Sequence, residues 1–106
     1  MPYADVTPED VVARLARGED VYLLDVREPE EVAEWAYPIG VHIPMGQLGE
    51  RLDELPTDRA IVVACAAGSR SAAVAAALSE RGWTAENLAG GAIAWAAMEP
   101  NAPRGG

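Results

Sequence analysis

The sequence contains no lysine, one cysteine and one histidine, and each of these scarcities excludes a kind of site. Without lysine, the chain can form neither a Walker A phosphate loop nor a Schiff base, because both need that side chain. The single cysteine, Cys65, excludes an internal disulfide. Together with the single histidine, His42, it also excludes zinc sites built from four Cys/His ligands and sites with two histidines. We therefore expect no metal site.

Positive charge and long apolar runs are scarce as well. The 106 residues carry 8 basic and 17 acidic side chains, so the net charge is -9 and the surface repels a nucleic-acid backbone. No apolar run reaches the roughly 20 residues of a membrane-spanning helix. The N-terminal stretch "MPYADVTPED" lacks the basic and apolar regions of a secretory signal. We expect a cytoplasmic protein that binds neither nucleic acid nor membranes.

What the sequence does contain is an alternation of apolar runs and helical patterns. Runs of buried-strand character lie at 21–26, 41–44 and 60–65. Helical patterns lie at 7–18, 27–35, 45–55, 71–82 and 92–98. Such an alternation predicts an α/β fold with a mostly parallel sheet and helices on both faces. No linker divides the chain, so we expect one domain over residues 1–98 and a flexible tail over 99–106.

The candidate site is the loop that begins at Cys65, where the run at 60–65 ends. Six small or polar residues follow the cysteine: Ala66, Ala67, Gly68, Ser69, Arg70 and Ser71. In parallel α/β folds, ligands bind beyond the carboxyl ends of the strands. Gly68 can adopt a positive φ, so that successive N–H groups point inward, and the next helix adds its positive end. These groups and the Arg70 cation favour a reactive Cys65 thiolate.

The same residues allow other interpretations. A lone cysteine is often a buried, inert hydrophobe, although the strand end, the tight loop and the arginine favour a nucleophile here. A serine-hydrolase elbow needs G-x-S-x-G, and "GSRSA" has arginine where the nucleophile should stand. A Cys–His pair would need His42, for which we expect packing or hydrogen bonding instead. Phosphate or arsenate chemistry at a cysteine loop remains a minor alternative.

Three stretches resemble signatures of the single-domain rhodanese family of sulfurtransferases. "LLDVREPEEVAE" at 23–34 resembles the first signature, and "CAAGSRSA" at 65–72 matches the C-x-x-G-x-R-S active loop. "NLAGGAIAW" at 87–95 matches the closing Gly-Gly-x-x-x-Trp motif. The resemblance runs from about residue 5 to residue 98. It implies a rhodanese-like fold, with a mostly parallel sheet of about five strands and helices on both faces.

The resemblance also implies a reaction. Cys65 would take a sulfane sulfur from a donor such as thiosulfate or a persulfide, and pass it to a thiol or to cyanide without a cofactor. The substrate would lie against residues 66–71. Cysteine phosphatases place five residues between cysteine and arginine, whereas four separate Cys65 from Arg70, which fits one added sulfur better. Asp25 and Arg27 match positions that brace the site; the alternative is an exposed ion pair worth under about 1 kcal/mol.

Two departures from the family pattern stand out. "WAYPIG" at 35–40 replaces a usual Gly-His-Ile-Pro-Gly-Ala, so Trp35 and Tyr37 form either an apolar partner patch or a locally repacked loop. Ala66 and Ala67 stand where many members carry a polar or basic side chain, so we expect thiosulfate to bind weakly. Trp95 is expected in the core.

Two functions follow as hypotheses. The first is a sulfurtransferase that uses a small sulfur-containing anion or persulfide as donor and a thiol as acceptor, a small protein included. The second is a non-catalytic module of the same fold that binds a partner or carries sulfur. In either case we expect a monomer or a weak dimer.

Overall fold

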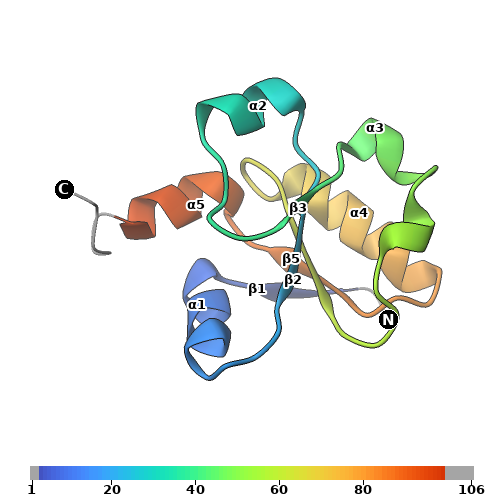
Figure 1. Cartoon of the computed structure of the whole chain (residues 1–106), viewed down its shortest axis with the longest axis horizontal. Helices are drawn as coiled ribbons and strands as arrows, with labels where there is room; N and C mark the ends of the chain where they lie inside the picture. The colour runs from blue at the N-terminus through green and yellow to red at the C-terminus, as the bar shows by residue number, and fades with distance from the viewer. Residues whose placement is uncertain (1–2, 100–106) are drawn as a thin grey trace.

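The computed structural model describes residues 3–99 and confirms the predicted α/β architecture. Five strands form one sheet in the order β1-β5-β4-β2-β3, and all neighbouring strands are parallel (Figure 1). The strands are β1 Ala4–Val6, β2 Tyr22–Asp25, β3 Val41–His42, β4 Ile61–Ala64 and β5 Ala85–Leu88. Residues 100–106, which hold most of the predicted flexible tail, lie outside the described residues.

Helices cover both faces of the sheet, as the alternation predicts. They are α1 Pro8–Ala16, α2 Pro29–Glu34, α3 Met45–Leu48, α4 Ser69–Glu80 and α5 Gly91–Met98, with a 3-10 helix η1 at Leu52–Glu54. In Figure 1, α1 and α5 lie to the left of the sheet and α3 and α4 to its right. Helix α2 lies beyond the carboxyl end of β2, at the edge of the sheet where the candidate site is expected.

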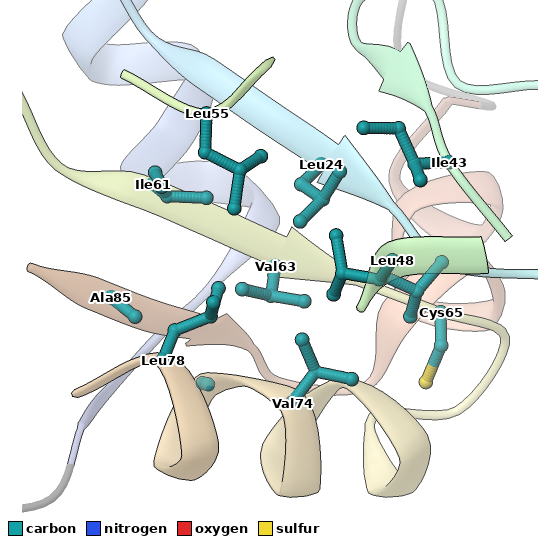
Figure 2. Close-up of a cluster of buried hydrophobic side chains, with 12 residues drawn as sticks. Leu24, Ile43, Leu48, Leu55, Ile61, Val63, Cys65, Val74, Leu78 and Ala85 are labelled. Atoms are coloured by element: carbon teal, nitrogen blue, oxygen red, sulfur yellow. The ribbon is translucent and has the colours of Figure 1, made fainter. Parts of the chain in front are cut away.

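The two faces of the sheet belong to two separate apolar clusters, because successive strand residues point to opposite sides. In β4, Ile61 and Val63 join the cluster under α4 and α3, whereas Val62 and Ala64 join the cluster under α1 and α5. Figure 2 shows the first cluster. Burial of side chains of this size contributes about 1.5–3 kcal/mol each. The sheet is therefore a rigid base for the loops at its carboxyl edge.

The structure differs from the predicted elements in four segments. Strand β5, Ala85–Leu88, lies in a stretch for which no strand was predicted. Strand β1 was not predicted, because three residues with only Val6 buried give no detectable period. The helix predicted over 45–55 is divided into α3 and η1, and two glycines, Gly46 and Gly49, weaken its centre by about 1 kcal/mol each. Helix α4 begins at Ser69, two residues before the predicted start, so the arginine of the loop lies on its first turn.

Candidate active site

Cys65 follows β4 directly and lies at the carboxyl edge of the sheet, as predicted, with 1% of its surface exposed. Figure 2 shows it at the end of the first cluster, with its sulfur turned away from Leu24 and Val63. The chain then turns into α4 through Gly68, whose φ of 102° is left-handed. Glycine is needed there because residues that carry a side chain rarely adopt that backbone conformation.

The Cys65 sulfur is surrounded by donors of its own loop. The backbone N–H of Gly68 donates to Sγ at 3.1 Å and that of Ser71 at 3.4 Å, and Ser71 Oγ lies 3.2 Å from Sγ. Burial raises the pKa of the Cys65 thiol, but hydrogen bonds from the Ser71 hydroxyl, when it points at the sulfur, and from three loop N–H groups outweigh it. The net pKa lies below the ordinary value. The loop therefore favours the thiolate.

The carbonyl groups of the loop are held by the start of α5. The N–H of Ala92 donates to the Cys65 carbonyl oxygen at 2.9 Å, and the N–H of Ile93 donates to that of Ala66 at 3.0 Å. A Cβ atom at Gly91, where φ is +55°, would lie 2.6 Å from the Cys65 carbonyl oxygen. Residue 91 therefore has to be glycine for α5 to reach the loop. This is a physical role for the Gly-Gly motif.

Tyr37 holds the Cys65 carbonyl from the other side. Its phenol donates a hydrogen bond to that oxygen at 2.6 Å, and the side chain is 8% exposed. Burial raises the pKa of Tyr37, so the phenol remains a donor. The ring packs edge-on against Trp35 and Trp95, with ring centroids 5.0 and 5.6 Å away. Of the two predicted alternatives for Tyr37, the structure therefore matches the locally repacked loop and not a surface patch.

Arg70 does not face the sulfur as a free cation. Its guanidinium makes two 2.8 Å hydrogen bonds to the carboxylate of Glu31 on α2. These bonds raise the pKa of Arg70, and the charge of a Cys65 thiolate raises it less. Arg70 is therefore not a free cation at the sulfur, and the hydrogen bonds that lower the pKa of the thiol most come from Ser71 and the loop N–H groups.

Asp25 and Arg27 form a buried ion pair at the end of β2, with 4% and 3% of their surfaces exposed. The Arg27 guanidinium donates to both carboxylate oxygens of Asp25, at 2.8 to 3.2 Å. It also donates to the carbonyl oxygen of Glu31 at 3.4 Å. The alternative of an exposed ion pair is wrong, and the pair instead supports the segment that carries the partner of Arg70.

The remaining predicted side chains have structural roles. His42 Nε2 lies 2.7 Å from the carbonyl oxygen of Arg27, which confirms a hydrogen-bonding role. Trp95 is 3% exposed and lies in the core, as predicted.

Within residues 3–99, no group of three His, Cys, Asp or Glu side chains is placed to hold a metal ion. Within that part of the chain, none of the helices has the length and apolar composition that a membrane-spanning segment requires.

Four residues of the site were not predicted, and they come from four separate segments. They are Glu31, Tyr37, Gly91 and Asn87, whose side-chain oxygen accepts a hydrogen bond from the Ser71 hydroxyl at 2.5 Å. Of these, only Gly91 had a local signal, because it stands in a Gly-Gly pair directly before a helix. The other three act through contacts that depend on the tertiary fold.

The fold and the loop together define a class of protein: a parallel α/β domain with an N–H-lined cysteine loop at the carboxyl edge of its sheet. Comparison with known families narrows the class. The protein-family model described as the rhodanese-like domain matches residues 7–98 of the chain. The chain therefore belongs to the rhodanese-like domain family. The resemblance seen in the three signatures is confirmed.

Individual relatives agree with this assignment. A protein named "Sulfurtransferase" from Allochromatium vinosum is 40% identical over 93 residues, which cover 87% of each chain. The crystal structure of a rhodanese-like domain protein from Staphylococcus aureus has a TM-score of 0.83 and 32% identity, covering 87% of this chain and 90% of that one. The crystal structure of reduced Bacillus anthracis CoADR-RHD also has a TM-score of 0.83, with 31% sequence identity. This match covers 92% of this chain but only 17% of that longer chain.

Proposed function

We propose that this chain is a sulfurtransferase that carries a sulfane sulfur on Cys65. The thiolate attacks the outer sulfur of a donor such as thiosulfate. A new S–S bond forms on Cys65, the S–S bond of thiosulfate breaks, and sulfite leaves with its electron pair. A thiolate or cyanide then attacks the outer sulfur of the persulfide and releases the Cys65 thiolate. Neither step needs a metal or an organic cofactor.

The observation that carries the proposal is the set of donors around the Cys65 sulfur. The N–H groups of Gly68 and Ser71 point at Sγ, and preorganised donors of this kind stabilise a thiolate before attack. They can stabilise the persulfide anion in the same way. The four residues between Cys65 and Arg70 make a small ring, which favours one added sulfur over a phosphate. Phosphatase or arsenate reductase activity is therefore the weaker alternative.

The other residues take supporting roles in this proposal. The substrate contacts the loop over residues 66–71, with the N–H groups as its main donors, because Ala66 and Ala67 offer no polar side chain. Asp25 and Arg27 support α2, which holds the partner of Arg70. We further propose that residues 1–98 act as one domain in the cytoplasm, as a monomer or weak dimer.

The proposal is tested by sulfur transfer from two donors, thiosulfate and glutathione persulfide, to two acceptors, cyanide and dithiothreitol. We expect turnover with at least the persulfide donor, and a higher KM for thiosulfate because the net charge of -9 repels a dianion. The KM for thiosulfate should fall as salt screens that charge. Absence of turnover with every pair would refute the enzyme proposal and favour the non-catalytic module.

A Glu31→Gln variant is expected to bind thiosulfate more tightly. The change removes the negative partner of Arg70 and leaves its guanidinium available to a dianion, so we expect the KM for thiosulfate to fall about threefold or more. The side-chain oxygen of glutamine can still accept the hydrogen bond from the Glu28 N–H, so the start of α2 is kept. The measurement is the initial rate as a function of thiosulfate concentration.

Glu30→Gln provides the matched control, because Glu30 is exposed, lies on the same helix turn and carries the same charge. Equal effects of the two variants would show that only the overall charge matters. The assay is run near neutral pH, where the Glu31–Arg70 pair is intact. Hydrogen bonds from Arg70 and from the Glu28 N–H lower the pKa of Glu31 from 4.5 to about 2. The stability that the pair contributes is therefore present above about pH 4.5 and lost as the pH falls toward 2.

A further inference from the structure

A chain of polar side chains runs from Cys65 to the edge strand β1. Ser71 Oγ, 3.2 Å from the Cys65 sulfur, donates to Asn87 Oδ1 at 2.5 Å. Asn87 Nδ2 in turn donates to Asp5 Oδ1 at 3.0 Å. Ser71 is 0% and Asn87 5% exposed, while Asp5 lies at the surface. Three elements, α4, β5 and β1, are thus linked to the nucleophile through successive hydrogen bonds.

The direction of each hydrogen bond in this chain is fixed from its outer end. A carboxylate oxygen only accepts, so Asp5 requires Asn87 to present its NH₂ group outward. The carbonyl oxygen of Asn87 then faces Ser71, and it also only accepts. A serine hydroxyl has one hydrogen. That hydrogen is therefore committed to Asn87, and a lone pair of Ser71 Oγ faces the Cys65 sulfur.

Unlike the loop N–H groups, which favour the thiolate, this chain of side chains suits a Cys65 thiol better. The S–H of the thiol can donate to the lone pair of Ser71, which leaves every group in the chain paired. Beside a thiolate, the same lone pair is repulsive. The Ser71 hydroxyl can serve the thiolate only by leaving the buried oxygen of Asn87 without a donor, which is costly. The two acceptors compete for one hydrogen.

We propose that Asp5 is a positioning residue that acts through Asn87 to hold the Ser71 hydroxyl away from a Cys65 thiolate. The resting cysteine is then kept as a thiol more than its loop N–H groups alone would allow. The importance of Asp5 for sulfur transfer rests on the proposed function. Its effect on the protonation of Cys65 is independent of that function.

The charged and titratable groups around Cys65 have other partners. On α4, Arg70 binds Glu31 of α2. At the end of β2, Arg27 binds Asp25. The phenol of Tyr37 donates to the carbonyl oxygen of Cys65. Their effect on the thiol is exerted through space or through the backbone, so a change at Asp5 that acts through the Ser71 hydroxyl can be separated from theirs.

The test is the pH dependence of Cys65 alkylation by iodoacetamide, which is unambiguous because the chain has no other cysteine. In Asp5→Asn, the amide at residue 5 can accept as well as donate, so Asn87 can turn its NH₂ group toward Ser71. The hydroxyl is then free to donate to the thiolate. We expect the apparent pKa of Cys65 to fall by about one unit. Asp5 is exposed, so this near-isosteric change should leave the fold intact.

Two further variants separate the relay from a direct effect of the Asp5 charge. Asn87→Leu removes the competing acceptor without changing any charge, and it should lower the apparent pKa of Cys65 in the same direction. In a Ser71→Ala background, most of the Asp5→Asn shift should disappear, because no hydroxyl is left to redirect. Glu9→Gln, a charge change of the same size on α1, should leave the pKa of Cys65 unchanged.

The outcomes decide the proposal whether or not the protein transfers sulfur. An unchanged pKa in a folded Asp5→Asn variant would overturn it. A shift of equal size with and without Ser71 would also overturn it, because the charge would then act directly. If Ser71→Ala does not fold, Asn87→Leu decides: an unchanged or higher pKa in a folded Asn87→Leu protein contradicts the relay. Failure of all sulfur-transfer assays would refute the proposed function but not this inference.

Discussion

A Cys65→Ser variant is expected to lose sulfur transfer to the level of the uncatalysed reaction and to remain folded. The serine hydroxyl can accept the N–H groups of Gly68 and Ser71, as the sulfur does. However, a hydroxyl is not ionised near neutral pH and cannot form a persulfide. We expect kcat to fall by about a thousandfold or more, because the covalent step is lost entirely. The measurement is steady-state turnover with the donor that works best for the wild type.

Cys65→Ala provides the second comparison for this prediction. It keeps the small size of the side chain but removes any atom that could attack a donor. Circular dichroism and urea unfolding should show folded protein for both variants, since the position is a buried end of the first cluster rather than its centre (Figure 2). Turnover near the wild-type rate in either folded variant would mean that sulfur does not pass through Cys65.

A Gly91→Ala variant is expected to destabilise the protein by about 3–5 kcal/mol, which combines backbone strain with overpacking. The added Cβ would lie 2.6 Å from the Cys65 carbonyl oxygen and 2.7 Å from the carbonyl carbon and oxygen of Ala66. These are backbone atoms, and they cannot rotate away as the end of a side chain could. The start of α5 would have to retreat from the loop, with loss of the Ala92 hydrogen bond. Urea unfolding measures the cost.

Gly82→Ala is the matched control for the clash. Gly82 also has a positive φ, +102°, but a Cβ atom there would meet nothing within 4 Å. Only the backbone strain remains, so we expect a loss of about 1–2 kcal/mol. Activity measured on the folded fraction should fall in Gly91→Ala and stay unchanged in Gly82→Ala. Equal destabilisation by the two changes would contradict the close approach of α5 to the active loop.

The part of the site that could be predicted is the part that is local in sequence. An apolar run followed by Cys65, small residues, Gly68 and a helix specifies a strand, a tight turn and a helix start. Each step depends on neighbours along the chain. The parallel direction of neighbouring strands follows from the alternation of strands and helices along the chain. The position of the cysteine at the carboxyl edge could therefore be predicted without knowing any tertiary contact.

The part that could not be predicted depends on which loops the sheet brings together. Glu31 is one of several acidic residues in "REPEEVAE", and no local pattern shows that it binds Arg70, 39 residues further along the chain. Tyr37 reaches the Cys65 carbonyl across 28 residues. Asp5 reaches Asn87 across 82 residues. In that last case the short edge strand itself was missed, so the partner of Asn87 could not be inferred either.

The pairing of Arg70 with Glu31 was missed for the same reason. From the sequence, an arginine five positions after Cys65 is a cation beside a thiol, and the expected effect is a lower pKa of the thiol. The fold places a carboxylate against that arginine, and the loop N–H groups then become the main stabilisers of the thiolate. Arg70 remains a substrate-binding candidate only to the extent that a donor can displace Glu31, which the Glu31→Gln variant measures.

The most direct test of the account is the intact mass of the protein after brief exposure to a sulfur donor. Wild type and Cys65→Ser are treated with thiosulfate or with glutathione persulfide, measured, and measured again after addition of cyanide. We expect the wild type to gain the mass of one sulfur atom and lose it to cyanide, and the serine variant to gain nothing. A wild type that gains no sulfur from either donor, or a serine variant that gains the same mass, would contradict a transferable persulfide on Cys65.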